Sequence, residues 1–288
     1  DTILRDRARD AGAEVRHGVA VEDVDLEADA ASVRADGETL RSRYFVDATG
    51  QDRLLARKLG SVRPYERFGK AAAFTHFSDL PAAAREELGP DNDIRVIVIP
   101  DGWLWAIPLT GNRLSVGLVS RKPGLRTRRL DEYLAESPLF GRLLAGATRG
   151  ETRLIGNFSF ASTAASGARF ACVGDSACFI DPVFSSGVSL AILRAASVVE
   201  RLAPALAHGE EGDPTLMASL EASMQRGYET FAALVDRFYN TRFVDNMIFG
   251  APDEGELRAG VISVLAGDVF RDDNPFQEML LRSRRRPP

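Results

Sequence analysis

The chain has 288 residues, of which 45% are hydrophobic and 27% charged, and its formal net charge is −5. These values indicate a folded globular protein with length for one large or two modest cores, and they exclude a disordered tail, a collagen-like repeat and a disulfide-rich miniprotein. The mildly acidic net charge creates no positive field that would attract nucleic acid. No apolar stretch is long enough for a membrane helix or a leader peptide. We therefore expect a cytoplasmic protein that binds neither nucleic acid nor a membrane.

The sequence also predicts reduced thiols and no metal centre. Cys172 and Cys178 are too few for a disulfide framework, and they have no metal-ligand spacing with any of the 3 histidines. The chain opens with Asp1-Thr2-Ile3-Leu4, a pattern typical of the middle of a helix, and its first methionine is Met217. We therefore expect this chain to be a fragment.

The first 60 residues predict a helix followed by short strands. A helical pattern covers residues 1–12 and stops at Gly12, and Asp36-Gly37 is a strong hairpin turn. Strands are expected at Glu14–His17, Val19–Leu26, Ser32–Ala35 and Leu40–Val46. The last strand runs into Asp47-Ala48-Thr49-Gly50, and a short helix follows over Arg53–Leu59, ended by Gly60.

A stretch rich in predicted strands follows over residues 61–164. The expected strands are Lys70–Phe77, Ile94–Ile99, Trp103–Pro108 and Leu114–Ser120, separated by Pro, Gly, Asp and Asn. Two helices are expected within this stretch, at Leu80–Leu88 and Leu130–Leu144. We interpret the stretch as a sheet-based domain of its own.

A strand, a turn and a long helix occupy residues 170–206. The strand Phe170–Val173 ends at Gly174-Asp175, and the helix Val188–Leu206 begins after Ser185-Ser186-Gly187. One face of that helix carries Val188, Ile192, Ala195, Val199 and Leu202. The rest of the chain is predicted to be helical, chiefly over Pro214–Tyr239 and Glu256–Ala266.

The turn between this strand and helix carries groups that suit a cofactor. A glycine at a strand end lets a ligand approach the backbone, and Asp175 is placed to accept from a polyol hydroxyl. Pro182 stiffens the loop, and the backbone N–H groups of Ser185-Ser186-Gly187 favour an anion, such as a halide, or the electron-rich edge of a flavin. Each piece by itself also occurs as an ordinary strand end or helix cap, so the order of the pieces carries the interpretation.

In this order, the motifs resemble those of an FAD-binding domain of the glutathione-reductase type, in the superfamily of aromatic hydroxylases and geranylgeranyl reductases. The resemblance implies an α/β (α+β) fold with an FAD domain over 1–60 and 165–206, an inserted β-sheet substrate domain over 61–164 and a helical region over 207–288. It implies that the FAD domain lacks its N-terminal βαβ unit, since no Gly-x-Gly-x-x-Gly occurs in the chain. The implied FAD contacts are Ala48, Thr49, Gly50, Gly174, Asp175, Pro182, Ser185, Ser186, Gly187 and Val188.

A second motif selects one family within that superfamily. Gly102-Trp103-Leu104-Trp105-Ala106-Ile107-Pro108 is similar to the Gly-Trp-x-Trp-x-Ile-Pro signature of the flavin-dependent halogenases. Alternation on a strand puts Trp103 and Trp105 on one face, where the resemblance implies a wall between the organic substrate and the flavin. An ordinary core strand with two large anchors is the alternative. The implied catalytic residues are Trp103, Trp105, Ser186 and Gly187.

The resemblance also implies a halogenation reaction. In the family, FAD reduced by a separate flavin reductase forms a hydroperoxide with oxygen, chloride or bromide attacks it, and a lysine directs the hypohalous acid to an aromatic ring. The segment from Asp181 to Gly187 resembles the phenol and pyrrole enzymes, whose substrates are often tethered to a carrier protein. The family's lysine is expected upstream of this chain, since neither Lys58 nor Lys70 lies in its motif. The alternatives are a monooxygenase or double-bond reductase on the same scaffold, and an inactive truncated remnant.

Several further side chains allow two interpretations. His76 could line a substrate pocket or act as a general base, although a structural role is favoured. Cys178 and Phe184 are expected to pack, and Asp181 either positions the loop or contacts the flavin ring. An aromatic group in the C-terminal region either lines an aromatic-substrate cavity or forms a helical core stripe: Phe231, Phe238, Tyr239, Phe243 and Phe249.

Overall fold

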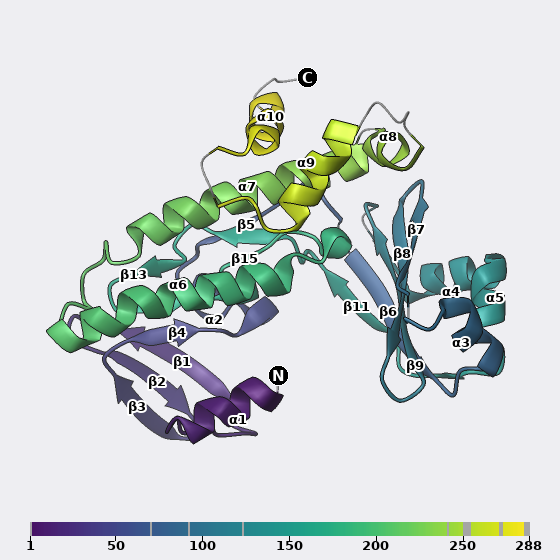
Figure 1. Cartoon of the computed structure of the whole chain (residues 1–288). Coiled ribbons are helices and arrows are strands. Elements are labelled where there is room, and N and C mark those ends of the chain that lie inside the picture. Colours follow the sequence, from purple (N-terminus) through teal and green to yellow (C-terminus); the bar gives the residue numbers. More distant parts are fainter. Residues whose placement is uncertain are drawn as a thin grey trace.

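The chain folds into two lobes joined by long helices, as Figure 1 shows. The structure is a computed structural model, and it describes residues 2–69, 71–91, 93–122, 124–240, 242–249, 255–270 and 273–284. One lobe holds the N-terminal strands and the long helix α6, and the other holds a sheet with short helices on one side (Figure 1). The protein therefore mixes helices and sheets, as the sequence predicts.

The N-terminal segment folds as a helix and a three-stranded meander. Helix α1 spans Thr2–Asp10 and ends before Gly12, where φ is 97°. The meander consists of the antiparallel strands β1 (Val21–Leu26), β2 (Ala31–Ala35) and β3 (Glu38–Ser42). Its second turn is Asp36-Gly37, with φ values of 52° and 76°, which confirms the predicted two-residue hairpin.

Two predicted strands in this segment are wrong. Residues 14–17 form no strand, because no strand among the described residues pairs with them. The predicted strand Leu40–Val46 is split in two: β3 ends at Ser42, and β4 (Phe45–Asp47) belongs to a different sheet. The chain has to leave one sheet to enter the other, and this crossing interrupts the strand.

A parallel strand pair brings together two motifs that lie far apart in the sequence. Strand β4 pairs in parallel with β14 (Phe170–Cys172), and β13 (Ser166–Gly167) completes that sheet on the far side of β14. Parallel strands end at the same edge of their sheet. Asp47 lies opposite Cys172, so the Asp47-Ala48-Thr49-Gly50 turn and the Gly174-Asp175 turn emerge side by side.

The second lobe is built on a six-stranded antiparallel sheet. Its strands are β6 (Ala71–Ser78), β7 (Arg95–Ile99), β8 (Gly102–Leu109), β9 (Arg113–Ser120), β10 (Thr148–Arg149) and β11 (Arg153–Gly156). The order is β10-β6-β9-β8-β7, with β11 also paired to β6. The four strands predicted here are confirmed, with Lys70 outside the described residues.

Three helices cover one face of this sheet (Figure 1): α3 (Ala82–Leu88), α4 (Thr127–Glu136) and α5 (Pro138–Leu143). Leu104 and Leu118 from the sheet pack with Leu130 and Phe140 from the helices in a buried core. The predicted single helix over 130–144 is two helices, because Pro138 has no backbone N–H to donate and instead begins α5. The opposite face of the sheet stays free to line a cavity.

A small sheet and the C-terminal helices complete the fold. The sheet has the order β15-β12-β5 and consists of β5 (Val62–Pro64), β12 (Phe160–Ser162) and β15 (Cys178–Phe179). The remaining helices are α2 (Leu54–Lys58), α6 (Gly187–His208), α7 (Ala218–Asn240), α8 (Phe243–Phe249), α9 (Gly255–Leu265) and α10 (Pro275–Arg284). In the part of the chain that the structure describes, none of the helices has the length and apolar composition needed to cross a membrane.

Helix α6 does not bury its apolar face. Val188, Ile192 and Val199 from that face are 72%, 57% and 62% exposed. The residues that it buries include Leu190 and Arg194 instead. The buried side of this helix therefore contacts the strands beneath it through the polar guanidinium of Arg194.

The buried Arg194 joins three elements. Its Nε donates to the carbonyl oxygen of Cys172 at 2.6 Å, and its Nη2 donates to the carbonyl oxygen of Ala165 at 3.2 Å. The same guanidinium forms an ion pair with Glu221 of α7 at 2.6 Å. Arg194 is fully buried, so α6, β14 and α7 are held together by a charge with little access to water.

Candidate active site

The first strand end is held by a buried carboxylate. Asp47 Oδ1 accepts hydrogen bonds from the backbone N and from Oγ1 of Thr49 at 2.8 and 2.7 Å, and its Oδ2 accepts from the backbone N of Leu55 at 2.8 Å. Gly50 follows with a φ of 60° and opens a 3₁₀ turn. Asp47 therefore shapes the Ala48-Thr49-Gly50 turn from within and is itself inaccessible to a ligand.

The second strand end carries a carboxylate that faces outward. Gly174 has a φ of 58°, and Ser176 Oγ donates to the carbonyl oxygen of Asp47 at 2.6 Å, which ties the two strand ends together. Asp175 is half-buried; burial raises the pKa of its carboxyl, and the nearby Gln51 amide partly opposes this rise. The buried Nε2 atom of Gln51 is the donor that acts on this carboxyl.

The loop that follows leads into an open helix end. Asp181 Oδ1 accepts from the backbone N of Val183 at 3.0 Å, and Pro182 begins a 3₁₀ turn that ends at Ser185 with a φ of 53°. No side chain caps the N-terminus of α6, which begins at Gly187. Unpaired N–H groups at a helix start carry a partial positive charge, so this end favours an anion.

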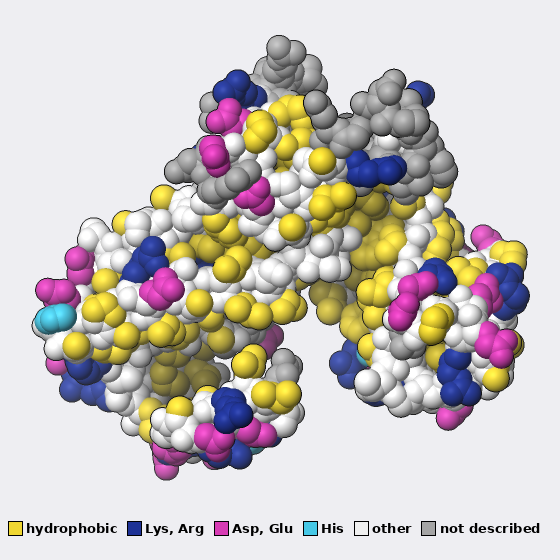
Figure 2. Space-filling view, in the orientation of Figure 1, with side chains coloured by type: hydrophobic (Ala, Val, Ile, Leu, Met, Phe, Trp, Pro, Cys, Tyr) yellow, Lys and Arg dark blue, Asp and Glu magenta, His cyan; other side chains and the backbone are white. Residues whose placement is uncertain are grey.

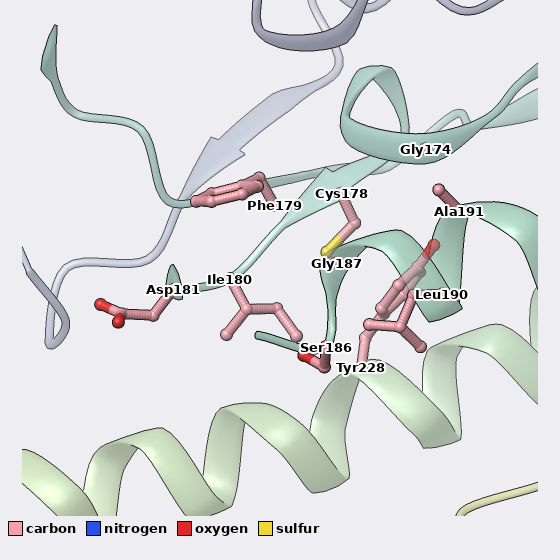
Figure 3. Close-up of a pocket in the computed structure, with 10 residues that line it drawn as sticks. All are labelled: Gly174, Cys178, Phe179, Ile180, Asp181, Ser186, Gly187, Leu190, Ala191 and Tyr228. Atoms are coloured by element: carbon pink, nitrogen blue, oxygen red, sulfur yellow. The ribbon is translucent and has the colours of Figure 1, made fainter. Parts of the chain in front are cut away.

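A small pocket lies beside this helix end (Figure 3), with a volume of about 20 Å³. Ser186 and Gly187 line it together with Gly174, Cys178 and Tyr228. Figure 3 shows the Asp181 carboxyl directed away from Cys178 and Gly187. The volume is close to that occupied by one water molecule, so the pocket can hold only a very small group.

A larger cavity of about 530 Å³ separates the loop from the sheet of the second lobe. On the loop side it is lined by Gln51, Asp175, Phe179, Asp181, Pro182, Val183, Ser185, Gly187 and Val188. On the other side it is lined by Ala72, Phe74, Ile94, Val96, Trp103, Trp105, Ile107, Ser115, Ile155 and Phe158. Figure 2 shows hydrophobic side chains in the hollow between the two lobes.

The two tryptophans line this cavity from the same face of β8, as alternation predicts. Their ring centroids are 5.6 Å apart at an angle of 46°. Trp103 is 4% exposed, whereas Trp105 is half-buried and donates from Nε1 to Ser115 Oγ at 3.1 Å. A Cβ at Gly117 on the neighbouring strand would lie 2.2 Å from the Trp105 ring, so only glycine leaves room for that ring.

A buried chain of hydrogen bonds links the tryptophan wall to the loop. Trp103 Nε1 donates to Tyr239 Oη at 2.9 Å, and Tyr239 Oη donates to Asp181 Oδ2 at 2.9 Å. Burial raises the pKa of the Asp181 carboxyl to about 6. The chain joins β8, the end of α7 and the loop before α6, so Asp181 positions the loop through contacts with protein groups on both of its oxygens.

Replacement of Asp181 by Asn should remove a pH dependence of stability. The raised pKa means that the folded state binds the proton more tightly than the unfolded state, so this carboxyl favours folding at low pH. That contribution is lost as the pH rises from about 4 through about 6, by up to about 3 kcal/mol. In urea unfolding, the free energy of unfolding of the wild type should fall relative to that of Asp181→Asn as the pH rises from about 4 to about 6.

Glu211 supplies a control of opposite sign for that experiment. Hydrogen bonds, first from Arg43, lower the pKa of the Glu211 carboxyl to about 2. Its stabilising effect is therefore present above the usual carboxyl range and is lost as the pH falls toward 2. Glu211→Gln should change the pH dependence of the free energy of unfolding only below the usual carboxyl range. If stability fell equally between pH 4 and 6 in Glu211→Gln and in Asp181→Asn, Asp181 would not be the group that titrates there.

The structure divides the predicted site residues into three groups. Asp175, Pro182, Ser185, Gly187 and Val188 line the larger cavity opposite Trp103 and Trp105. Gly174 and Ser186 line the small pocket, which Gly187 shares. Ala48, Thr49 and Gly50 form the neighbouring turn and line neither space.

Several other side chains that the sequence suggested as site residues lie at the surface or pack within the protein. His76 is exposed on β6, and Lys58 forms ion pairs with Asp23 and Asp25 at 2.8 and 2.7 Å. Phe184 packs edge-on against Phe238 with ring centroids 5.8 Å apart. Of the aromatic group, Phe231, Tyr239 and Phe243 are buried, Phe238 packs partly buried against them, and the Phe249 side chain lies outside the described residues.

Sequence reasoning did not identify Gln51 as a site residue, and it named Tyr239 only within the C-terminal aromatic group, without a link to Trp103 or Asp181. Gln51 directly follows the Ala48-Thr49-Gly50 motif, which is the one signal that could have pointed to it. Tyr239 lies 136 residues from Trp103 and 58 residues from Asp181, so no local pattern connects them. Within the described residues, no group of His, Cys, Asp and Glu side chains could hold a metal ion.

A family model for tryptophan halogenases matches residues 1–252 of the chain. The chain belongs to the tryptophan halogenase family. A tryptophan 2-halogenase of Chondromyces crocatus is 31% identical over 265 residues, which cover 83% of this chain and 48% of that protein. A Pseudomonas fluorescens chlorinase of 1H-pyrrole-2-carbonyl groups on a peptidyl-carrier protein is 24% identical over 286 residues, covering 94% of this chain and 63% of the relative.

The fold is similar to that of a solved FAD-dependent halogenase. The myxobacterial chondrochloren halogenase CndH, described as an FAD-dependent halogenase, is 26% identical and superposes with a TM-score of 0.70 over 98% of this chain and 72% of CndH. The chain spans 48% and 63% of the lengths of the two relatives named above.

Proposed function

We propose that this protein binds FAD in the cavity of about 530 Å³ and takes part in the halogenation of an aromatic substrate, a phenol or a pyrrole. Family membership supports the flavin, and the pair of tryptophans supports halogenation over direct attack of oxygen on the substrate. The observation that carries the proposal is the position of Trp103 and Trp105 across the cavity from the open N-terminus of α6.

The residues of this cavity fit a flavin. Trp105 and Pro182 offer flat apolar surfaces on opposite sides for a ring system. The Asp175 carboxyl, beside the Gln51 amide, is an acceptor for a ribityl hydroxyl. A Cβ at Gly187 would meet no atom within 4 Å, so the space beside the helix N-terminus is open to a ligand.

The small pocket of about 20 Å³ fits a halide ion. Ser186 and Gly187 line this pocket at the start of α6, where backbone N–H groups favour an anion. A halide is a single-atom anion, and the pocket has room for only one small group of this kind. Chloride or bromide bound here would lie at the border of the larger cavity, because Gly187 lines both spaces.

The chain's own residues would bind and separate the reactants. Reduced FAD, which we propose a separate flavin reductase supplies, would give two of the four electrons that reduce oxygen, and the halide, oxidised to hypohalous acid, would give the other two. Ser186 and Gly187 would hold the halide, while Trp103 and Trp105 would keep the organic ring away from the flavin. Two relatives act on pyrrole groups carried by a peptidyl-carrier protein, which supports a tethered substrate as one form of the proposal.

FAD binding is tested by Gly187→Val. The new side chain would enter open space that belongs to the cavity, so the fold should persist while FAD affinity falls at least tenfold, or about 1.4 kcal/mol. Gly141→Val on α5 is the matched control, since a Cβ there also meets no atom within 4 Å. Isothermal titration with FAD would measure both, and a wild-type chain that binds no FAD would favour an inactive remnant.

Halogenation is tested with a flavin reductase, FAD, oxygen and a panel of phenols and pyrroles, each with and without bromide. A brominated product that appears only with bromide, detected by its isotope pattern in mass spectrometry, is the expected result. A hydroxylated product formed at the same rate without bromide would show a monooxygenase instead. Reduction of a double bond without oxygen uptake would show a reductase.

A further inference from the structure

A second cavity, of about 600 Å³, lies on the other side of the tryptophan wall. It is open to solvent and is bordered by β7 and the start of β8 in the sheet lobe and by the end of α7 and the start of α8, and these elements lie near one another in Figure 1. Its lining includes Val96, Val98, Pro100, Arg121, Phe238 and Tyr239. A volume in this range is typical of a small-molecule site.

The second cavity is divided from the first by one hydrogen-bonded pair. Val96 lines both cavities, Trp103 lines only the first, and Tyr239 lines only the second. The bond from Trp103 Nε1 to Tyr239 Oη, 2.9 Å long, joins the two side chains between these spaces. A ligand in the second cavity would therefore lie against Tyr239 and be separated from the first cavity by the Trp103 indole.

Arg121 brings an uncompensated positive charge to this cavity. Its guanidinium donates to the carbonyl oxygens of Tyr239 and Pro100 at 2.6 and 3.0 Å and to Oδ1 of Asn240 at 3.2 Å. All three acceptors are neutral, and no carboxylate of the described residues forms an ion pair with it, although Asp245 also lines the cavity. The neighbouring Lys122 does have a carboxylate partner, Asp101, at 2.7 Å.

The charge is held in a fixed position against an aromatic surface. The Cζ atom of Arg121 lies 5.7 Å from the ring centroid of Tyr239. Phe238 stands at 87° to Tyr239 with centroids 5.2 Å apart, so two rings form one wall of the cavity. Val98 supplies the opposite apolar surface and is 49% exposed. Flat apolar walls and a fixed guanidinium suit a planar ring that bears a carboxylate.

We propose that this second cavity binds an aromatic carboxylate, with the ring between Val98 and Phe238 and the carboxylate against Arg121. The proposal of a binding site is supported by the geometry of this cavity alone. The assignment of that site to the organic substrate rests on the proposed halogenase function. In that assignment Arg121 is a specificity-determining residue, and the Trp103–Tyr239 pair is the partition between the carboxylate-bearing ring and the flavin cavity.

Fluorescence titration with benzoate and with its neutral isostere benzamide tests the binding. The chain's 2 tryptophans are Trp103 and Trp105, and Trp103 is bonded to the cavity residue Tyr239, so indole emission reports on this region. Benzoate should bind at least tenfold more tightly than benzamide, and added salt should weaken only benzoate. Arg121→Gln should abolish the difference, while Lys122→Gln, whose cation is already paired, should preserve it.

Charge substitutions at Val98 keep the test decisive if Arg121→Gln impairs folding. Val98 is an exposed position on the edge strand β7, so either charge can be placed there without disturbing the core. Both substitutions remove the same valine contact and should therefore affect benzamide equally, whereas benzoate should bind more weakly to Val98→Glu than to Val98→Lys. Equal affinities for benzoate and benzamide, no response to these substitutions, or no binding at millimolar concentration would overturn the proposal.

Activity assays separate this proposal from the proposed function. If benzoate binds in an Arg121-dependent manner but no aromatic acid is halogenated, the second cavity is a binding site and the substrate assignment is wrong. If hydroxybenzoates are halogenated and Arg121→Gln raises KM for them more than for neutral phenols, both proposals hold. If they are halogenated with no effect of Arg121→Gln on binding or KM, the halogenase proposal holds and the second cavity proposal fails.

Discussion

Arg194→Met should lower the free energy of unfolding by about 3–5 kcal/mol. The substitution leaves the carbonyl oxygens of Cys172 and Ala165 without their donor at a position with no exposure to solvent, and it removes the partner of Glu221, whose side chain is 33% exposed. Each buried acceptor left unpaired costs about 1–3 kcal/mol, and methionine restores only the volume of the side chain. The effect should be seen as a lower urea midpoint with an unchanged denaturant slope.

Two further variants identify the source of that loss. Arg201→Met removes an arginine from the same helix at a position with more solvent access, and it should cost well under 1 kcal/mol. The double variant Arg194→Met with Glu221→Leu should lose less than the sum of the single variants, because neither charge is then left unpaired. Strict additivity would contradict the account of Arg194 and Glu221 as a coupled ion pair.

Trp103→Ala should destabilise the protein by about 3–5 kcal/mol, which is the usual cost of deleting a buried aromatic ring. Trp103 is 4% exposed, packs in the core that also contains Tyr228 and Phe231, and donates to Tyr239. Its loss would leave a hole between the two cavities and take a donor from the Tyr239 hydroxyl. Thermal and urea unfolding would measure the stability, and quenching of the remaining indole by acrylamide would report how far the wall has opened.

Trp105→Ala is the matched comparison, since both tryptophans lie on the same face of β8. Trp105 is half-buried and bonds to Ser115 at the cavity side, so its removal should cost only about 1–2 kcal/mol. Equal losses in the two variants would show that the tryptophans play the same structural part, contrary to the burial seen here. The comparison thus separates the structural anchor from the side chain that mainly lines the cavity.

Local patterns predicted most of the secondary structure. The Asp36-Gly37 hairpin, the four strands of the second lobe and helix α2 are confirmed, because each depends on residues near one another in the chain. The division of the helix predicted over 130–144 has a local cause in Pro138, whereas two other errors occurred where distant partners decide. Residues 14–17 lack a strand partner among the described residues, and the strand predicted over 40–46 divides because its two ends pair with different sheets.

The burial of helix α6 was decided by its neighbours rather than by its own pattern. The apolar positions from Val188 to Val199 suggest a buried face, but the structure exposes them and buries Arg194, for which Glu221 and two backbone carbonyls provide partners. A buried arginine is tolerated only where such partners exist. Since those partners come from β14, the segment before it and α7, the sequence of the helix alone could not reveal them.

The sequence by itself determined the motifs that end the strands, the tryptophan spacing on β8 and the open start of α6, since each is a short-range feature of backbone geometry or alternation. Only the tertiary structure decided that these motifs face one another across a cavity, that Trp103 and Trp105 differ in burial, and that Tyr239 connects Trp103 with Asp181. These features depend on contacts between residues more than 50 positions apart, and packing and hydrogen-bond satisfaction select such contacts only when the whole chain has folded.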